Sequence, residues 1–595
     1  MYLSNLIIKN FRNFEYIDIP LTKNVVLLGE NRVGKSNLLH AIRLVFDLSL
    51  SDSERHLKLS DFWDGCDLSK APQIEVHLDF ADFDSDLALA ALLTDFRRSD
   101  LPTVARLSYV FRKKPSVSGT AASSEDYEFV VFGGGEETRS VSSRVRRRIS
   151  LDMLHALRDA EGQLASWRNS PLRPLIEDAM ASVDRADLES VTNDLESANA
   201  KIESFDSVRK LEDSLRSRIH DLSGNSQDTD ARLRFSPSDP TRLFRALSLF
   251  IDGGKRGINE ASLGSANVAL LALKLAEFSW LRQKNERNYS VLCIEEPEAH
   301  LHPQLQRSVF DKLFNDVTSD QSLVVTSHSP TLAAIAPLRS VINLRHLGGS
   351  TKAFSLACLP ISSDELEDIE RYLTATRSEM LFARGVIFVE GDAEEALLPV
   401  FVDSLGHNLD ELGITVCNVA GVNFKPYVKL ATGLGLPFSV VTDWDPLDGN
   451  RQPLGIERTL GIWDAYCEVS GRALLSTSER ASWSNCDFTR FSSIWSQAGI
   501  FLNNQTFEVA VAQTPSLQGA LLNILDEQGF GSTRAARINA WKTSQSVDPS
   551  QLLSMVSDIG KGRLSAKLAK KINGLMPPSY ITSAIKFVVS KVSNV

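Results

Sequence analysis

The sequence contains little cysteine and no long apolar run. Its 595 residues include six scattered cysteines without a CxxC pair, so neither a disulfide framework nor a cysteine-ligated metal site is expected. No stretch approaches the roughly 18 consecutive apolar residues that a membrane span requires. The chain begins directly with a strand-like pattern, without a basic leader. These absences predict a cytoplasmic protein.

An excess of positive charge is also missing, since the formal net charge is −11. Net charge averages over the whole surface, however, whereas nucleic-acid binding depends on local patches. One basic run lies at residues 144–148, and no acidic residue follows Asp558. Solvated helix faces are the alternative interpretation of both runs. The basic residues beyond Asp558 are Lys561, Arg563, Lys567, Lys570, Lys571, Lys586 and Lys591.

The chain is long enough for two to four domains. Strand and helix patterns alternate over residues 1–165, 236–375 and 380–595, which is typical of α/β domains. In residues 166–235 a charged helical pattern takes their place. There Leu188, Val191 and Leu195 recur at steps of three to four residues, as in a coiled-coil-like seam. We expect this segment to be a helical dimerisation insert.

Residues 29–36 (GENRVGKS) match the phosphate-binding pattern G-x-x-x-x-G-K-[ST]. A β-rich run precedes them and a helical pattern follows, which is the context that this motif needs. The glycines let backbone N–H groups surround the phosphates, the lysine reaches the β- and γ-phosphates, and the serine hydroxyl binds Mg²⁺. The predicted ATP-binding residues of this loop are Gly29, Asn31, Gly34, Lys35 and Ser36.

Two further strand ends complete the predicted nucleotide site. The apolar run 291–294 ends in Glu295 and Glu296. We expect Glu295 to reach Mg²⁺ and Glu296 to orient the attacking water. His328 follows the apolar run 323–326 and could sense the γ-phosphate. An exposed acidic turn and a structural histidine are the alternatives, and the neighbouring phosphate loop argues against them.

A second group of carboxylates follows two strands of the last region. Glu390 ends the apolar run 386–389, and Asp443 and Asp445 follow the run 437–442. The carboxyl ends of parallel strands meet at one edge of a sheet, so these side chains should converge. Carboxylates packed together repel one another unless cations lie between them. The pattern therefore predicts a divalent-metal site.

The nucleotide motifs resemble those of ABC-type ATPases of the SMC-like branch. Residues 262–265 (SLGS) look like a divergent signature motif, carried by Ser262 and Gly264, and Arg12 resembles an N-terminal arginine near the nucleotide. In such ATPases the signature helix of one head points at the γ-phosphate held by the other. The resemblance implies at least a homodimer.

The strand–EG, Gly421 loop and strand–DxD arrangement resembles the Toprim domain. Its fusion to an ABC-type ATPase is similar to the OLD (overcoming lysogenization defect) family, which includes the nuclease subunit of the Gabija anti-phage system. The resemblance implies an α/β fold with an SMC-like ATPase and a C-terminal Toprim domain. It also implies further site residues, in which the glutamates and the threonine help to bind metal and the lysine is catalytic: Glu394, Thr506, Glu508 and Lys561.

The family resemblance implies an ATP-dependent DNA endonuclease. Glu390, Asp443 and Asp445 would hold one Mg²⁺ or Mn²⁺ and Glu394 and Glu508 a second, in two-metal hydrolysis of a phosphodiester. A third ion would accompany ATP. The expected partners are double-stranded DNA, further copies of the chain in a homodimer or homotetramer, and a UvrD-like helicase. The alternatives are a non-cleaving SMC-like clamp and a topoisomerase, although no tyrosine has a recognisable nucleophile setting.

Overall fold

The structure is a computed structural model. It describes residues 1–121, 123–154, 170–223, 244–245, 247–284, 286–316, 320–446, 452–483 and 486–593. The chain forms two compact units: the first contains residues 1–154, 289–298 and 302–595, and the second contains residues 155–288 and 299–301. The expected boundaries at 165/166 and 235/236 lie outside the described residues. No helix among the described residues is long and apolar enough to cross a membrane.

The first unit begins with an antiparallel sheet of strand order β2-β1-β4-β5-β6-β7. Strands β5 and β6 form an antiparallel pair within it. The strands of this sheet are β1 (Tyr2–Phe11), β2 (Phe14–Pro20), β4 (Ile74–Ala81), β5 (Ala105–Lys113), β6 (Tyr127–Gly133) and β7 (Glu136–Ser140).

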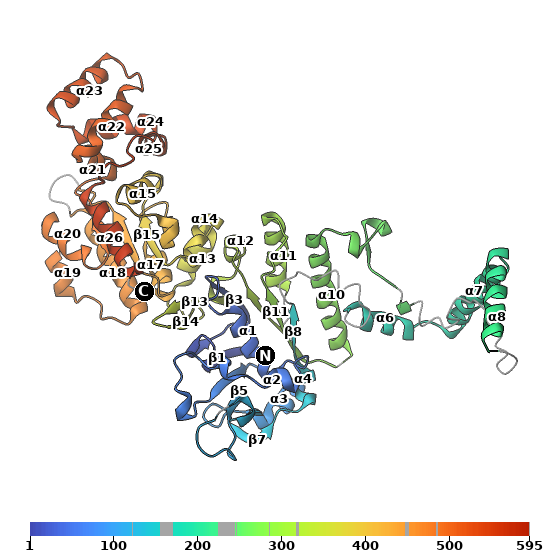
Figure 1. Cartoon of the computed structure of the whole chain (residues 1–595). Coiled ribbons are helices and arrows are strands. Elements are labelled where there is room, and N and C mark those ends of the chain that lie inside the picture. The colour runs from blue at the N-terminus through green and yellow to red at the C-terminus, as the bar shows by residue number, and fades with distance from the viewer. Residues whose placement is uncertain are drawn as a thin grey trace. The chain divides into compact units, whose positions relative to one another are not determined.

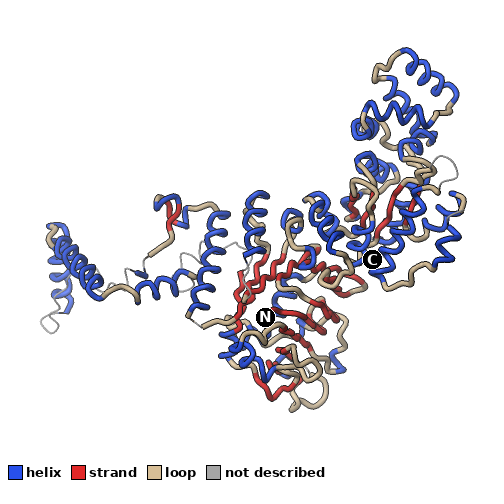
Figure 2. The backbone as a smooth tube through the Cα atoms, turned by 180° about the vertical axis from the view of Figure 1, so that it is seen from behind, coloured by secondary structure: helices blue, strands red, loops and turns tan. Residues whose placement is uncertain are grey.

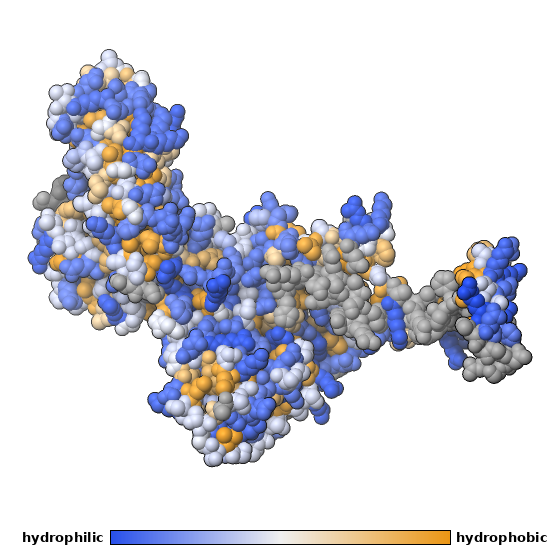
Figure 3. All heavy atoms as spheres, viewed as in Figure 1, coloured by the Kyte–Doolittle hydropathy of each residue, from blue (hydrophilic) through white to orange (hydrophobic). Residues whose placement is uncertain are grey.

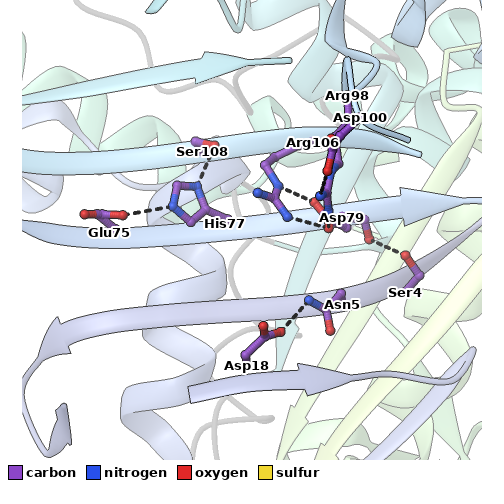
Figure 4. Close-up of polar contacts among 10 residues, drawn as sticks. All are labelled: Ser4, Asn5, Asp18, Glu75, His77, Asp79, Arg98, Asp100, Arg106 and Ser108. Atoms are coloured by element: carbon purple, nitrogen blue, oxygen red, sulfur yellow. Dashed lines mark hydrogen bonds and ion pairs between the residues drawn. The ribbon is translucent and has the colours of Figure 1, made fainter. Parts of the chain in front are cut away.

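Strand β4 shows why this sheet has one apolar and one polar face. Ile74, Val76, Leu78 and Phe80 alternate with polar residues and are fully buried. Figure 4 shows the polar side, where the carboxylate of Asp79 accepts hydrogen bonds from two arginines. These contacts satisfy a buried charge, so the polar face is held by paired groups. The residues drawn beside Asp79 are Ser4, Asn5, Asp18, Glu75, His77, Arg98, Asp100, Arg106 and Ser108.

A second sheet carries the predicted nucleotide motifs and has the strand order β14-β13-β3-β12-β11-β8. Its central strands pair in parallel, and only β13 and β14 are antiparallel. The helix expected after the phosphate loop is α1 (Lys35–Phe46). The strands are β3 (Asn24–Gly29), β8 (Ile149–Leu154), β11 (Tyr289–Glu295), β12 (Gln321–Thr326), β13 (Val341–Leu347) and β14 (Ser350–Ser355).

The last region contains a four-stranded parallel sheet of order β16-β15-β17-β18. Strands β15 (Gly385–Val389) and β17 (Phe438–Thr442) coincide with the expected runs 386–389 and 437–442. The other two strands are β16 (Ile414–Asn418) and β18 (Ile500–Leu502). Figure 2 shows these strands in red with helices around them. Helices α13 (Ser363–Tyr372) and α14 (Ala375–Ser378) precede the sheet.

Helices surround this sheet and form its core with it. Helix α26 (Ser579–Ser593) buries Ile581, Ile585 and Val588 and packs against β15, β17 and β18. Helix α15 (Asp392–Ser404) packs against α25 (Lys561–Ala569). The other helices are α16 (Leu409–Leu412), α17 (Lys425–Gly433), α18 (Leu454–Ser470), α19 (Thr477–Trp483), α20 (Phe488–Ser496), α21 (Phe507–Gln513), α22 (Pro515–Asp526), α23 (Ser532–Ser544) and α24 (Pro549–Ile559).

The second unit is helical in the range where a charged helical pattern was expected. It contains α6 (Leu172–Ala181), α7 (Arg185–Glu203), α8 (Asp206–Ser223) and α10 (Leu263–Gln283). Helices α7 and α8 form the hairpin labelled in Figure 1. Several of its large apolar side chains are exposed, among them Phe205 and Leu211, and Figure 3 shows orange atoms among the blue on this hairpin.

Candidate nucleotide and metal sites

The phosphate loop connects the end of β3 to the start of α1. Gly29 and Gly34 have φ angles of 145° and 104°, which favour glycine. A Cβ at Gly34 would also collide with the side chain of Asn13. Lys35 is buried, and its Nζ donates to the carbonyl oxygens of Gly29 (2.9 Å) and Glu30 (3.0 Å). Burial lowers the pKa of Lys35 to about 8, so an anionic phosphate would strengthen its charged form.

The two other strand ends lie beside this lysine. The Nδ1 atom of His328 is 3.4 Å from Lys35 Nζ, and its Nε2 atom is 3.5 Å from the carboxylate of Glu296. Burial and the neighbouring Lys35 lower the pKa of His328. The structure thus brings together Lys35, His328 and Glu296. Glu295 is the last residue of β11, immediately before them.

The remaining predicted residues of this site have less direct placements. Arg12 donates to Asp61 (2.9 Å) and to Asn37 (2.8 Å) of α1. Ser36 is exposed in the first turn of α1. Asn31 lines a cavity of about 530 Å³ together with His328 and residues of the loop. Their roles in nucleotide and Mg²⁺ binding stay predictions.

Glu298 is a site residue to which the sequence pattern assigned no role. Its carboxylate accepts hydrogen bonds from the His328 backbone N–H (2.7 Å) and the Ser327 hydroxyl (3.0 Å). Burial raises the pKa of Glu298, and its Oε2 atom has no hydrogen-bond partner among the described residues. Glu298 therefore positions the loop that carries His328. The sequence signal for Glu298 was its position three residues after Glu295, the last residue of β11.

The signature-like segment opens α10 of the second unit. Ser262 is the N-cap residue and accepts a hydrogen bond from the Ser265 backbone N–H (3.2 Å). Gly264 is buried, and a Cβ there would come within 2.8 Å of the His300 carbonyl oxygen. Only glycine fits this contact. The part that Ser262 and Gly264 play toward a nucleotide stays a prediction.

The metal site predicted from the sequence lies at the carboxyl ends of β15 and β17. These strands pair in parallel, and Glu390 and Asp443 follow them directly. The Glu390 carboxylate accepts hydrogen bonds from the Thr442 hydroxyl (2.5 Å) and the Asp443 backbone N–H (3.0 Å). The two strand ends are therefore joined through Glu390.

Arg458 of α18 lies between two of the predicted metal ligands. Its Nη1 atom donates to Glu390 (2.7 Å) and its Nη2 atom to Asp445 (2.6 Å). The side chain of Arg458 is only 8% exposed, so its charge is matched by these carboxylates. Sequence reasoning missed Arg458, because nothing in its local sequence links a helical arginine to a strand end 68 residues away.

A second cluster contains buried carboxylates on three elements. Glu394, Asp443 and Glu508 are 6–8% exposed. Burial, and then the neighbouring carboxylates, raise the pKa of Glu394 and that of Asp443 to about 8. The Oε2 atom of Glu508 and the Oγ1 atom of Thr506 are buried without a hydrogen-bond partner among the described residues. Such orphaned oxygens beside repelling carboxylates fit a divalent cation.

The ammonium of Lys561 lies at this cluster. Its Nζ atom is 2.9 Å from the Glu508 carboxylate. Burial opposes the charge of Lys561, but the hydrogen bond to Glu508 raises its pKa. Lys567, a second lysine of α25 only six residues further along, donates instead to Gln528 at 2.9 Å. The geometry therefore favours Lys561 over Lys567 as the lysine of this site.

As they stand, no three His, Cys, Asp or Glu side chains in the described part of the chain form a group that could hold a metal. Several of the predicted ligands form ion pairs with protein cations instead. Arg458 pairs with Glu390 and Asp445, and Lys561 pairs with Glu508. Bound metal would take over part of that charge compensation. The assignment of individual ligands to two ions stays a prediction.

Two family models match the chain. The model described as AAA ATPase domain matches residues 1–129 and 147–333, which is more than half of the sequence. The model described as overcoming lysogenization defect protein-like, TOPRIM domain matches residues 381–445, the segment of Glu390 and Asp443. The chain belongs to the OLD family of ATPase–Toprim proteins. The expected order of an ATPase followed by a Toprim domain is confirmed.

Several relatives of this OLD-family chain are similar along most of its length. Endonuclease GajA of Bacillus cereus is 22% identical, and the alignment covers 78% of this chain and 78% of GajA. OLD nuclease of Thermus scotoductus is 25% identical over 75% of this chain and 83% of its own. The solved C-terminal region of the Burkholderia pseudomallei OLD protein is 32% identical. It covers 36% of this chain and 99% of that structure, with a TM-score of 0.32.

Proposed function

We propose that this OLD-family chain is an ATP-binding, metal-dependent DNA endonuclease. The observation that carries the proposal is the buried cluster of Glu394, Asp443 and Glu508 with Lys561 beside it. A site that buries three acids beside the partly exposed ammonium of a lysine is costly unless it binds cations and an anionic substrate. Two similar proteins are named endonuclease GajA and OLD nuclease, which supports a phosphodiester as the substrate.

The residues of the site have distinct parts in this reaction. Bound Mg²⁺ or Mn²⁺ would supply Lewis-acid activation of the phosphodiester and of the attacking water. One set of ligands is Glu390, Asp443 and Asp445, and the second is Glu394 and Glu508 with the hydroxyl of Thr506. Asn503 donates to Asp443 at 2.5 Å and fixes its orientation. Lys561 binds the scissile phosphate and neutralises its developing charge.

We further propose that the ATPase controls access of DNA to this site. Support comes from the linker that enters β15. Arg384 lies immediately before β15, and its guanidinium is 3.7 Å from the carboxylate of Glu30 in the phosphate loop. Arg345 of β13 donates to the Arg384 carbonyl oxygen at 3.0 Å. A nucleotide that moves the phosphate loop would act through these contacts on the strand that ends at Glu390.

The partners follow from the same proposal. The substrate is double-stranded DNA, and the chain assembles as a homodimer or homotetramer through its 166–235 insert and its ATPase. A UvrD-like helicase is a further proposed partner, and anti-phage defence is the proposed setting. Helices α25 and α26 carry most of the basic side chains beyond Asp558, and these supply positive charge for the DNA backbone.

The test is cleavage of plasmid DNA with Mg²⁺ or Mn²⁺ by the purified chain and by Asp443→Ala. We expect the variant to lose nicking and linearisation while its ATP binding and its oligomeric mass stay unchanged. Asp410→Ala, a matched control on the short helix α16, should cleave normally. Lys35→Ala should lose ATP hydrolysis instead. Wild-type nicking by Asp443→Ala, or a covalent protein–DNA adduct, would overturn the proposal.

A further inference from the structure

A cavity of about 570 Å³ lies near the start of β17, at the other end of the strand from Asp443. Phe438, the first residue of β17, lines it. Asp443 lies five positions after Phe438, so roughly 16 Å of strand lies between the cavity and the carboxylates. Helices α18, α19, α20 and α26 contribute the other walls, and Figure 1 labels them around this sheet. The cavity is therefore distinct from the metal site.

Six of the fourteen residues that line this cavity are aromatic. Its volume is in the range of small-molecule sites, about 300–1,000 Å³. Flat faces at several angles suit a planar ring system that can stack on one indole and meet the edge of another. The aromatic residues that line the cavity are Phe438, Trp463, Tyr466, Trp483, Trp495 and Phe587.

Two of these rings carry hydrogen-bond donors without an acceptor. The Nε1 atoms of Trp463 and Trp495 are buried and have no hydrogen-bond partner among the described residues. Trp495 is only 4% exposed. A buried N–H group without an acceptor carries a desolvation cost, and native proteins satisfy most such groups. Because these N–H groups are closed off from solvent, the surface that the two indoles offer to an occupant is their ring faces and edges rather than the N–H groups.

The charged residues that line the cavity are both cationic. The guanidinium of Arg472 lies 5.4 Å from the centre of the Tyr466 ring, and the ammonium of Lys591 lies 5.7 Å from that of Phe587. Both side chains are exposed, and neither pairs with a carboxylate within the described ranges. The nearby Asp464 is paired with Arg480. An anionic group at the opening of the cavity would be attracted by both cations.

We propose that this cavity binds a nucleotide. The base stacks among the indoles, while the phosphate is held by Arg472 and Lys591. The nucleotide is either a free mononucleotide or the terminal nucleotide of a DNA strand, since both present the same base and phosphate. This proposal is independent of the nuclease assignment, because binding can be measured without cleavage.

A row of packed rings connects the cavity to the metal site. Trp444 lies between Asp443 and Asp445 in the sequence, and its ring is 5.2 Å from that of Phe491. Phe491 in turn packs on Trp495 at 5.9 Å and on Trp483 at 5.7 Å. An occupant that shifts Trp495 would thus act on the backbone that positions both aspartates.

The test uses the full chain with Lys35→Ala, which weakens binding at the phosphate loop. AMP, dAMP, GMP and TMP lack the β- and γ-phosphates that this loop recognises, and their binding is measured by calorimetry. We expect the double variant Arg472→Glu/Lys591→Glu to weaken mononucleotide binding at least about tenfold, since it removes two charge-assisted contacts. Arg490→Glu, an exposed cation of α20 outside the lining, is the matched control and should bind normally.

Two further measurements separate the parts of the ligand. Adenosine lacks the phosphate, so its affinity should not change in the double variant. Trp483→Ala removes a ring on which the base stacks, and it should weaken the binding of both AMP and adenosine. Competition with a 5′-phosphorylated oligonucleotide identifies a strand end as the source if it displaces AMP, and a free mononucleotide if it does not. Absence of binding by all four mononucleotides, or undiminished binding by the double variant, would overturn the proposal.

Discussion

The guanidinium of Arg458 donates to the Glu390 carboxylate at 2.7 Å, on the edge of the sheet where a metal was expected. A second N–H group of Arg458 reaches Asp445 at 2.6 Å. The guanidinium of Arg458 thus pairs with both Glu390 and Asp445. Because a buried arginine costs free energy unless its charge is matched, Arg458 stabilises this edge and must give up part of its contacts when metal binds.

Replacement of Arg458 by glutamine should make the metal-free protein less stable. Removing one partner of a buried ion pair costs about 3–5 kcal/mol, and the partial exposure of the two acids lowers that figure here. Mn²⁺ should then raise the melting temperature of Arg458→Gln by more than it raises that of the wild type. Differential scanning fluorimetry with and without Mn²⁺ measures both changes. Equal Mn²⁺ shifts in the two proteins would show that Arg458 and the metal do not compete.

The second prediction distinguishes the two candidate lysines. Lys561 contacts the Glu508 carboxylate, whereas Lys567 contacts the Gln528 side chain. Lys561→Ala should lower the DNA cleavage rate about 100- to 1,000-fold, since it removes a preorganised cation from the reacting phosphate. Lys567→Ala is the matched control on the same helix and should stay within a few-fold of the wild type. A larger loss in Lys567→Ala than in Lys561→Ala would reverse the assignment.

Much of the frame around the site could be predicted from local sequence. Strands β15 and β17 are buried runs of apolar residues, and their ends at Glu390 and Asp443 follow from that pattern alone. The phosphate loop is equally local, because eight consecutive residues define it. Strand β18 was missed because its three residues, Ile500–Leu502, give too short a pattern to indicate a strand.

The contacts that complete the site could not be derived in this way. Glu508 and Lys561 entered the predictions only through the family resemblance, since 53 residues separate them and no local period connects them. Arg458 and Glu298 were not assigned at all. Arg458 reaches the site because tertiary packing turns its helix toward a strand end. Glu298 differs from the other acids of its turn because it is buried.

The third prediction concerns stability and pH without metal. The pKa of Glu394 and that of Asp443 are raised to about 8 in the folded protein, from ordinary values of 4.5 and 3.8. The folded state therefore binds more protons than the unfolded state between these values. The free energy of unfolding should fall as pH rises from about 5 to about 8, by at most about 1.4 kcal/mol per pH unit for each group.

Chemical denaturation in EDTA at several pH values measures this slope. Asp443→Asn removes one of the two ionisable groups and should flatten the decline. Saturating Mg²⁺ or Mn²⁺ should also flatten it, because a cation compensates the ionised carboxylates. If the metal-free protein became more stable as pH rises over this range, Glu394 and Asp443 would be ionised and paired with cations in the folded state. That result would contradict the raised pKa values of the two acids.

The last prediction concerns assembly. Helices α7 and α8 expose large apolar side chains, including Val191, Leu211 and Leu215 at 37%, 52% and 37%. An ATPase of SMC-like fold also completes its nucleotide site with a second copy, as the sequence resemblance implies, and closed symmetric oligomers are the usual outcome. We expect light scattering after size exclusion to give a mass that is an even multiple of the 65.7 kDa chain. The double variant Leu211→Lys/Leu215→Lys should lower that mass, whereas Lys210→Ala on the same helix should not. A wild-type monomer with and without ATP would contradict both the dimerisation role of the insert and a nucleotide role for Ser262 and Gly264.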